Sequence, residues 1–453
     1  MSHRGERILH LDALARVEGE GALHLAISDG EVTDTRLRIY EPPRFFEAFL
    51  IGRGHTEPPD ITSRICGICP VAYQMTACQA VEAACGVSVD GQLAELRRLL
   101  YYGEWIESQS LHIHLLHAPD FHGHPSAVEL AREQREPVER GLRIKQAGNA
   151  VMELLGGRAI HPVNVRLGGF YRVPTRSELA PLAEQLRRVR DDALETVRWV
   201  AGFDFPDAEI DCELLAMQDS GRYAIDSGVP TALSLTGGTT RNHSAAQRPF
   251  PVGEFEQHVV EEHVPHSTAL RSSLDGRRHL TGSLARYAVS GRWLHPTAAE
   301  AARAAGLGDP ATGAVCRNPF RSVIVRAVEV VHSVEEALRI IDAYEPPARP
   351  HVDVPPCPAE GCAATEAPRG LLYHRYAMDA DGTLTFARII PPTAQNQAAI
   401  EEDLRRLVQS RLDRPGDPPT DEELTTLCER AVRNHDPCIS CSAHFLHLTV
   451  DRV

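Results

Sequence analysis

The sequence carries two Cys-x-x-Cys pairs near opposite ends of its 453 residues, Cys66 with Cys69 and Cys438 with Cys441. Two intervening residues let both sulfurs of a pair turn to one side of a loop or helix start, where unpaired backbone N–H groups favour the thiolate form. Joined, the two pairs would make a four-thiolate site. Such a site suits zinc, iron–sulfur chemistry or another thiophilic transition metal.

Two simpler interpretations of these pairs stay open on spacing alone. A zinc staple usually has its two pairs close together, whereas here most of the chain separates them, and closing so large a loop is costly for a site that only staples. The pairs could also be unrelated redox or buried thiols. The other seven cysteines form no further Cys-x-x-Cys pair, so we expect buried side chains there and no iron–sulfur cluster in this chain. They are Cys78, Cys85, Cys212, Cys316, Cys357, Cys362 and Cys428.

Further motifs accompany the two pairs in a fixed order along the chain. With Arg64-Ile-Cys-Gly-Ile-Cys and Asp436-Pro-Cys-Ile-Ser-Cys, the sequence resembles the large, catalytic subunit of nickel–iron hydrogenases over essentially its whole length. Within that family it is most similar to the cytoplasmic NADP-linked branch, group 3b, also called sulfhydrogenases. The other ordered motifs are Arg16-Val-Glu-Gly, Glu41-Pro-Pro-Arg-Phe-Phe-Glu, Gly157-Arg-Ala-Ile-His-Pro, Glu366-Ala-Pro-Arg-Gly and Pro391-Pro-Thr-Ala-Gln-Asn.

This resemblance implies a fold and a chemistry. The fold would be α+β and predominantly helical, with a central bundle of long helices and small peripheral β-sheets. The activity would be bidirectional: heterolytic splitting of H2 into protons and electrons, and the reverse. All four thiolates would bind nickel, and Cys69 and Cys441 would also bridge to an iron that carries cyanide and carbon monoxide ligands. Soft thiolates suit nickel, and an open metal position would admit dihydrogen.

The resemblance also gives roles to three charged residues. Glu18 would pass protons outward from the nickel thiolates, with its pKa raised by burial and lowered by the cationic centre. Arg369 would lie over the two metals and be held by Asp436. The turns Ala367–Pro368 and Pro391–Thr393 would line the pocket of the iron ligands. On residue type alone, Glu18 would be a surface glutamate at a strand end and Arg369 a member of a loop ion pair.

A second metal site is implied by Glu47 and His444, which match the family's site for magnesium or a similar ion. A carboxylate suits magnesium, although a histidine is less usual for so hard an ion. On type alone, Glu47 is a helix-surface charge. A maturation protease would cut after His444 and release residues 445–453, whose alternating pattern is otherwise typical of a terminal strand.

Some positions depart from the family pattern or fall in its recurrent segments. Tyr73 stands where many hydrogenases have a histidine, so no role is transferred from that histidine. Ser108 stands where membrane-bound relatives place an acidic partner of the arginine over the metals, so Asp436 would act alone. We expect packing and hydrogen-bonding roles for three further residues, His112, Asp120 and His161.

Composition excludes several classes of function. The formal net charge is −15, and no basic run is present, so we expect no nucleic-acid partner. No apolar stretch approaches about 20 residues, and residues 1–16 lack the hydrophobic segment of a secretory signal, so we expect a cytoplasmic protein without a membrane span.

The resemblance implies partner subunits because one metal site offers no path for electrons. We expect an iron–sulfur small subunit, further subunits that carry FAD, iron–sulfur clusters and an NAD(P) site, and maturation partners, namely nickel-insertion proteins and the protease. Two alternatives come from other classes. A subunit of the complex I type, with a quinone site, shares the fold but lacks the four cysteines, and a zinc-stapled scaffold would have no redox activity.

Periodicity and turn signals place these motifs on elements. Strands are predicted over residues 8–11, 22–28, 31–40, 370–378 and 383–390. Helices are predicted over residues 45–50, 70–84, 92–118, 127–155 with a break at Pro137, 178–200, 255–264, 333–344, 394–412 and 421–433, the last beginning with a capping box at Thr420 and Glu423. We treat the chain as one body with four parts: an N-terminal β-hairpin region (1–43), a helical core with the first cysteine pair (44–200), a mixed region (201–345), and a part with a Pro-rich connector, a hairpin and the second pair (346–453).

Overall fold

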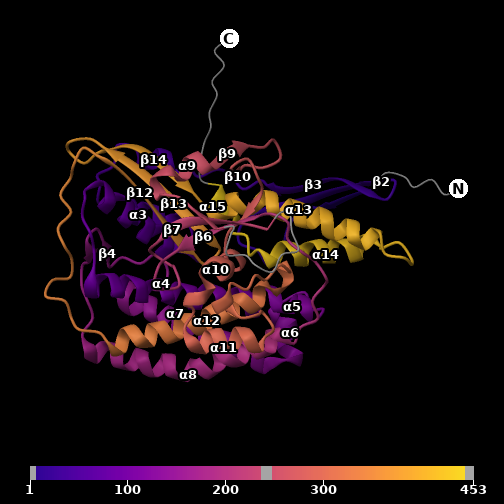
Figure 1. Ribbon diagram of the computed structural model, residues 1–453, viewed down its shortest axis with the longest axis horizontal. Helices are drawn as coiled ribbons and strands as arrows, with labels where there is room; N and C mark the ends of the chain where they lie inside the picture. Colours follow the sequence, from indigo (N-terminus) through magenta and orange to yellow (C-terminus); the bar gives the residue numbers. More distant parts are fainter. Residues whose placement is uncertain (1–6, 236–246, 444–453) are drawn as a thin grey trace, which may run out of the picture.

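Long helices form the centre of the molecule, and the computed structural model describes residues 7–235 and 247–443 of the chain. Four of these helices lie side by side in the lower half of Figure 1: α4 (Gly91–Leu111), α7 (Arg135–Gly156), α8 (Arg176–Ala201) and α12 (Ser322–Asp342). Helix α4 packs against α7 and α12, and α12 packs against α8. The predicted central bundle of long helices is confirmed.

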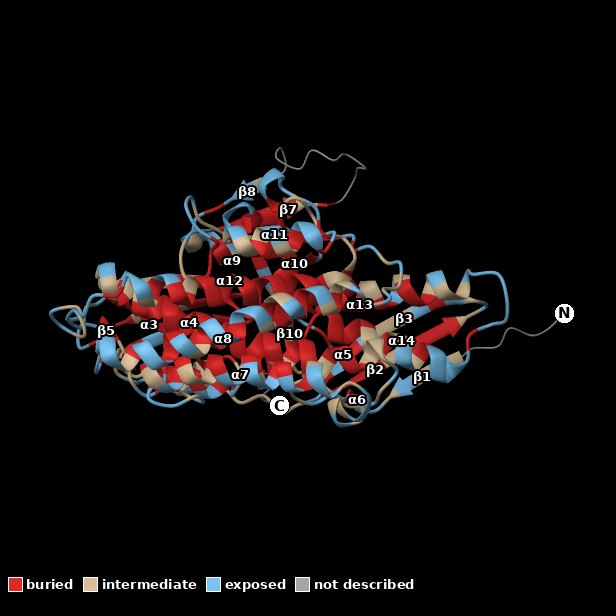
Figure 2. Cartoon of the chain, turned by 90° about the horizontal axis from the view of Figure 1, so that it is seen from below, coloured by how far each residue is buried: buried red, intermediate tan, exposed pale blue. Residues whose placement is uncertain are grey.

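Helix α4 is the most deeply buried of these helices. Every residue from Leu96 to Ser110 is buried, and the predicted apolar stripe that ends at Trp105 lies inside the core. Its close approach to α7 depends on a glycine, because a Cβ atom on Gly148 would lie 2.6 Å from the backbone nitrogen of Glu107. In Figure 2 the buried residues concentrate in this central layer, while the outer face of α8 is exposed.

Small sheets cover the upper side and one end of the helical layer. The N-terminal sheet pairs three antiparallel strands, and a second three-stranded antiparallel sheet follows the Pro-rich connector. The first contains β1 (Arg7–Leu11), β2 (Gly21–Ser28) and β3 (Glu31–Ile39), and the second contains β12 (Glu360–Ala367), β13 (Gly370–Met378) and β14 (Leu384–Ile390).

A four-stranded sheet of order β11-β6-β7-β8 and two strand pairs complete the β-structure of the described residues. The four-stranded sheet consists of β6 (Glu213–Gln218), β7 (Val229–Ser234), β8 (Gln247–Pro249) and β11 (His279–Leu280), and the pairs of β4 (Val165–Arg166) with β5 (Gly169–Phe170) and of β9 (Val259–His263) with β10 (Leu270–Leu274).

The remaining helices link these layers or pack at their edges. Helix α13 packs against β3 and α14, at the right of Figure 1. The remaining α-helices of the described residues are α1 (Phe46–Leu50), α2 (Pro58–Thr62), α3 (Pro70–Ala84), α5 (Ala118–Phe121), α6 (Ala127–Glu133), α9 (Phe255–His258), α10 (Ser283–Ser290), α11 (Pro296–Ala304), α13 (Pro392–Leu412), α14 (Asp421–Asn434) and α15 (Ile439–Ser442).

Several predicted elements differ from the observed ones. The helix predicted at residues 333–344 begins at Ser322, and the helix predicted at 255–264 ends at His258 and continues as strand β9. The predicted break lies at Gln134, not Pro137, because Pro137 occupies the first turn of α7, where its missing N–H costs little. The helix predicted over residues 92–118 is α-helical only as far as Leu111, and the chain continues as a π-helical segment, His112–His117.

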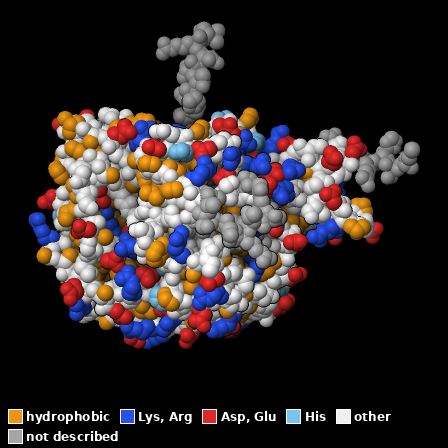
Figure 3. Space-filling view, in the orientation of Figure 1, with side chains coloured by type: hydrophobic (Ala, Val, Ile, Leu, Met, Phe, Trp, Pro, Cys, Tyr) orange, Lys and Arg blue, Asp and Glu red, His pale blue; other side chains and the backbone are white. Residues whose placement is uncertain are grey.

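The largest cluster of buried hydrophobic residues runs from Leu50 to Cys441, so distant parts of the chain share one core. The four-part division of the chain stays a prediction. Over residues 7–235 and 247–443, no helix is long and apolar enough to cross a membrane. Acidic and basic side chains are interspersed on the face shown in Figure 3.

Candidate metal centre

The four predicted cysteines meet in one buried cluster. The Sγ atom of Cys66 lies 3.5 Å from that of Cys438, and the Sγ atom of Cys69 lies 3.6 Å from that of Cys441. All four sulfur atoms lie within 4.8 Å of one another. Sulfur donors this close can share one metal ion, and the two pairs are therefore not unrelated thiols.

The first pair is positioned by the start of helix α3. Cys66 follows a 3-10 turn, Cys69 is the N-cap of α3, and Pro70 occupies the first helical position, where proline is favoured. The carboxylate of Glu104 on α4 accepts hydrogen bonds from the backbone N–H groups of Val71 (2.6 Å) and Ala72 (3.1 Å). Helix α4 thus anchors the helix start that carries the first two sulfurs.

The second pair is held by the N-terminal motif and by helix α13. Glu18 forms a parallel β-bridge with Cys438, in which Ile439 N donates to Glu18 O at 2.9 Å. The hydroxyl of Thr393 accepts from the Cys438 backbone N–H at 3.0 Å. Gly19 permits this approach, since its φ is +86° and a Cβ there would lie 2.8 Å from Ser440 N. The segments around Glu18 and Cys438, more than 400 residues apart in sequence, are therefore hydrogen-bonded to each other through their backbones.

Glu18 contacts the cluster directly. Its Oε2 atom accepts hydrogen bonds from Cys438 Sγ at 2.9 Å and from the backbone N–H of Ser440 at 3.1 Å. Burial, and then the negative charge of Cys66, raise the pKa of Glu18 above its ordinary value. A carboxyl in this position can take a proton from a thiol and release it again, which a solvated surface glutamate could not do here.

Each thiol of the cluster affects the protonation of its neighbours. Burial raises the pKa of Cys438 well above its ordinary value and that of Cys441 to about 11. Hydrogen bonds from the neighbouring thiols, that of Cys438 first, lower the pKa of Cys66 well below its ordinary value. The cluster thus stabilises one thiolate readily, and a cation must displace the remaining protons to obtain all four thiolates.

Arg369 and Asp436 are brought together as predicted. Arg369 Nε donates to the carbonyl oxygen of Asp436 at 2.9 Å, and Nη2 lies 3.2 Å from Asp436 Oδ1. Burial alone would lower the pKa of Arg369, but Asp436 and the cluster thiols hold it well above its ordinary value. Arg369 Nη1 is buried without a protein partner among the described residues, so this guanidinium has a donor left for a bound group.

Sequence reasoning missed Arg326 as a second cation at this carboxylate. Arg326 Nη1 lies 3.8 Å from Asp436 Oδ2, so Asp436 serves two arginines rather than one. Ser108, which replaces the acidic partner of relatives, is buried, and its hydroxyl has no hydrogen-bond partner among the described residues. No sequence signal distinguished Arg326, because it lies within a helix whose start was not predicted.

Arg44, in the predicted Glu41–Glu47 motif, also had no assigned role. Its guanidinium donates to the carbonyl oxygens of Ile65 (2.7 Å) and Ser440. One side chain therefore joins the residue before the first cysteine pair to a residue inside the second. A motif position of this kind could have been suspected because it belongs to one of the ordered motifs, ahead of the first pair.

The second predicted metal site is only partly described. Glu47 on α1 accepts a hydrogen bond from Ile389 N at 2.7 Å, while His444 and residues 445–453 lie outside the described residues. Glu261, a second acidic residue, is close enough to Glu47 for charge coupling, and burial first, with Glu47 contributing, raises the pKa of Glu261 to about 8.

Three residues expected to serve in packing do make structural hydrogen bonds. His112 contacts the carbonyl oxygen of Arg433 at 2.7 Å, and His161 contacts that of Ser63 at 2.7 Å. Asp120 pairs with Arg16 at 2.5 Å and with Arg433 at 2.7 Å. These contacts fix the segment before the second cysteine pair at Arg433 and the segment before the first pair at Ser63.

Comparison with known proteins shows the family to which the chain belongs. Residues 44–141 match the nickel-dependent hydrogenase family. The chain is 34% identical over 441 residues to the sulfhydrogenase 1 subunit alpha of Pyrococcus furiosus, covering 97% of this chain and 98% of that protein. The chain belongs to the nickel-dependent hydrogenases. It is a large, catalytic subunit of an oxidoreductase that acts on hydrogen.

Two further relatives support the assignment of this hydrogenase subunit. The sulfhydrogenase 2 subunit alpha of Pyrococcus furiosus is 32% identical, over 97% of this chain and the whole of that protein. A crystal structure of an NAD+-reducing [NiFe]-hydrogenase in the H2-reduced state has a TM-score of 0.80 and 28% identity, covering 97% of this chain and 99% of that chain. The predicted fold, α+β and predominantly helical, is confirmed for the hydrogenase subunit.

The donor set of the hydrogenase subunit fits a nickel–iron centre. Four sulfur donors are soft ligands of the kind that hold nickel and iron. Arg369, whose pKa the cluster thiols help to raise, has a buried Nη1 group without a protein partner among the described residues. The expected absence of an iron–sulfur cluster from this chain stays a prediction.

We predict that the purified hydrogenase complex contains nickel and iron in a ratio near one to one. Cys66→Ser should lower nickel at least about tenfold, because a serine hydroxyl is a hard donor that replaces a soft thiolate. Elemental analysis measures both metals. Cys362→Ser, which changes a partly buried thiol on β12, is the control and should keep the metals. Stoichiometric zinc without nickel would contradict the prediction.

Proposed function

We propose that this subunit catalyses H2 ⇌ 2 H+ + 2 electrons at a nickel–iron centre held by Cys66, Cys69, Cys438 and Cys441, and that partner subunits exchange the electrons with NADP(H). The observation that carries the proposal is the buried four-sulfur cluster with Glu18 at hydrogen-bonding distance. The whole-length similarity to sulfhydrogenase alpha subunits and the match to an NAD+-reducing hydrogenase support the link to a nicotinamide acceptor.

In this proposal, separate residues of the chain hold the metals, move the proton and position a donor. Nickel and iron held by the four cysteines would supply the Lewis-acid chemistry that splits dihydrogen. A proton that dihydrogen gives to the Cys438 thiolate would pass to Glu18 Oε2, which is 2.9 Å from the sulfur, and Glu18 would release the proton toward the surface. The buried Nη1 group of Arg369 has no protein partner among the described residues and is left for a bound group, and Asp436 fixes the orientation of that guanidinium.

We propose that the iron of this centre carries cyanide and carbon monoxide, as in the family that the sequence resembles. The free Nη1 donor of Arg369 supports a polar ligand beside it, because a buried charged donor without a partner is costly. Glu47, with Glu261 nearby, supports a magnesium or similar ion in the second site, with His444 as the expected further ligand.

Two other functions have less support. A quinone-site subunit of the complex I type would have no use for four clustered thiols, which this chain keeps buried together. A zinc-stapled scaffold would explain the sulfur cluster but not a carboxyl in contact with one of its thiols. The metal analysis distinguishes the scaffold from the hydrogenase directly.

We predict that electron transfer to NADP requires partner subunits. The described chain brings one cysteine cluster together, and electron transfer beyond a short gap needs intermediate centres. The complete complex should reduce NADP with H2, whereas the isolated, metal-loaded chain should not. Spectrophotometric assay of NADPH under hydrogen measures both. NADP reduction by the isolated chain would show that no iron–sulfur or flavin partner is needed.

We predict that Glu18→Gln lowers hydrogen–deuterium exchange with solvent at least about a hundredfold, because glutamine preserves size but cannot carry the proton. Mass spectrometry of HD and D2 formed from H2 in D2O measures the exchange, and nickel content should stay unchanged. Glu20→Gln alters an exposed carboxyl two residues away and should exchange like the wild type. Normal exchange in nickel-replete Glu18→Gln would remove Glu18 from the mechanism.

A further inference from the structure

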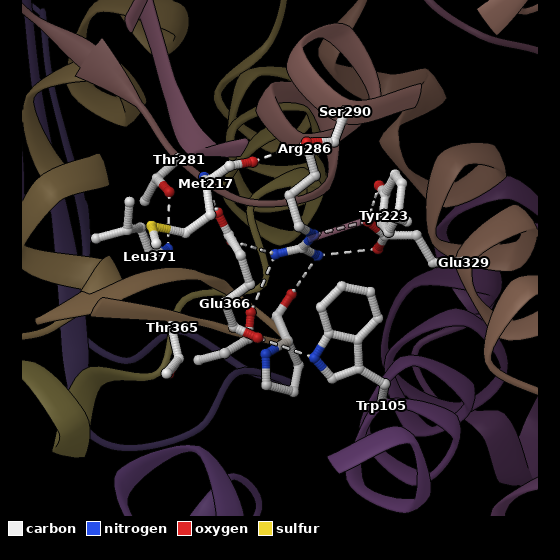
Figure 4. Close-up of polar contacts among 12 residues, drawn as sticks. Trp105, Met217, Tyr223, Thr281, Arg286, Ser290, Glu329, Thr365, Glu366 and Leu371 are labelled. Carbon is white, nitrogen blue, oxygen red and sulfur yellow. Dashed lines mark hydrogen bonds and ion pairs between the residues drawn. The ribbon is translucent and has the colours of Figure 1, made fainter. Parts of the chain in front are cut away.

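Arg286 on helix α10 holds the turn that carries Arg369. Its side chain is fully buried, and it donates to the carbonyl oxygens of Ala367 (3.0 Å, from Nη1) and Pro368 (2.9 Å, from Nη2). These two carbonyl groups belong to the residues directly before Arg369. Figure 4 shows the guanidinium between this turn and Glu329.

The other donors of Arg286 fix its own orientation. Nε and Nη2 bind the carboxylate of Glu329 on α12 at 2.7 and 2.9 Å, and Nη1 binds Glu366 at 3.1 Å. The guanidinium also lies 4.4 Å from the ring centre of Trp105 on α4. All five N–H donors of the guanidinium are therefore used, which a lysine with three donors cannot reproduce.

Glu329 is itself fixed by two further groups. The hydroxyl of Tyr223 donates to it at 2.7 Å, and the side-chain amide of Gln109 donates at 2.8 Å. Glu366 in turn accepts from the backbone N–H of Met217 at 2.7 Å. The charged groups beside Arg286 thus have defined positions and hold its guanidinium in one orientation. The guanidinium in turn holds the turn through the carbonyl oxygens of Ala367 and Pro368.

The start of α10 also binds the other side of the same turn. Thr281 Oγ1 accepts from the backbone N–H of Leu371 at 2.8 Å. Gly282 has φ +109°, and a Cβ there would lie 2.8 Å from the carbonyl oxygen of Arg369. Contacts from residues 281 to 286 therefore bracket Arg369, on the residues before it and on those after it.

We propose that Arg286 is a positioning residue that fixes Arg369 over the metal centre. The inference rests on the proposed role of Arg369. A purely structural ion pair would need Glu329 and Glu366 but not the two carbonyl groups, and buried ion pairs often add little stability. The hydrogen bonds to Ala367 and Pro368 connect the buried group of Arg286, Glu329 and Glu366 to the turn that carries Arg369.

The test is a double-mutant cycle in the intact, nickel-replete complex. Arg286→Lys should lower H2 oxidation at least about tenfold at unchanged nickel content, and it should alter the nickel electron paramagnetic resonance spectrum. Combined with Arg369→Lys, it should cause little further loss, because both changes remove the same positioned donor. Ser290→Ala is the matched control, since it removes a buried bond of the same helix to Met217 O at 2.7 Å and leaves the turn untouched.

Each outcome of the cycle has a stated meaning. Additive losses, or a normal spectrum and rate in nickel-replete Arg286→Lys while Arg369→Lys is impaired, overturn the proposal for Arg286 and leave the proposed function intact. Normal activity of Arg369→Lys would instead contradict the role of Arg369. If Arg286→Lys loses nickel, Thr281→Val decides: an altered spectrum at full nickel supports the positioning role, and an unchanged spectrum overturns it.

A separate pair of cysteines lies away from the metal centre. Cys85, directly after helix α3, and Cys357, in the Pro-rich connector, have their Sγ atoms 3.1 Å apart although 272 residues separate them. Both side chains are partly exposed and both thiols are free. The connector runs at the left of Figure 1 and returns to α3, where Gly361 packs against the backbone of Ala84.

We infer that Cys85 and Cys357 form a reversible disulfide when a low-molecular-weight disulfide such as oxidised glutathione is the oxidant. One protein thiolate attacks the oxidant and releases one reduced thiol, and the second protein thiol then displaces the other. The balance is two S–H bonds lost, one S–S bond formed, and one oxidant disulfide reduced to two thiols. The bond would tie the connector to the end of helix α3, whose N-cap is Cys69.

Peptide mapping of the intact complex tests this bond. Oxidised glutathione should produce a linked Cys85–Cys357 peptide, 2 Da lighter than the sum of its parts, and raise the melting temperature by about 4 °C, both reversed by dithiothreitol. Cys357→Ser should abolish the link and the shift, and Cys362→Ser should keep both. Separate glutathione adducts on Cys85 and Cys357, or free thiols at both after oxidation, would overturn the inference.

Discussion

Four sulfur atoms from two segments 372 residues apart must lie within 4.8 Å of one another inside the protein, and the rest of the structure follows from that constraint. Neither pair can be placed by its own short segment. The first depends on the start of α3 and therefore on Glu104 of α4, and the second depends on Glu18 and Thr393. The central helices and the peripheral sheets are needed together to hold two loops.

Charge balance is the second requirement of this site. Thiolates concentrate negative charge in a buried region, where unpaired charge is costly. Arg369 and Arg326 bring two positive charges against the single carboxylate of Asp436, so the protein side offers an excess of positive charge to the cluster. Glu18 contributes a carboxyl whose pKa is raised, so it can be present without adding a fixed negative charge.

Proline, glycine and capping residues in the sequence predicted those helices whose first and last residues they mark. Residues 70–84 match α3 because proline begins the helix and Gly86 follows it, and the capping box at Thr420 is present in the structure. The helix before residue 333 was missed because α12 is buried on nearly all sides there, so it lacks the polar stripe that reveals a surface helix. Residues 259–263 became a strand because β10 pairs with them, which no local pattern showed.

The same distinction applies to the site. The cysteines, Glu18, Arg369 and Asp436 could be predicted because ordered motifs identified them, and the structure brings them together. Arg326 and Arg286 could not, since each is one arginine inside a helix and only the fold shows what it touches. Their contacts join segments that are distant in sequence, and such pairings leave no trace in local periodicity.

The position of the second cysteine pair also sets the order of events during synthesis. A ribosome adds about 5–20 residues per second, so Cys66 leaves it roughly 20–70 seconds before Cys438 does. Throughout that interval a nascent chain has only two of its four sulfur ligands, and metal held by them would remain accessible from one side. Cofactor insertion can thus be completed only after the second cysteine pair has left the ribosome, which places the closing of the metal site after the synthesis of both central helices and peripheral sheets.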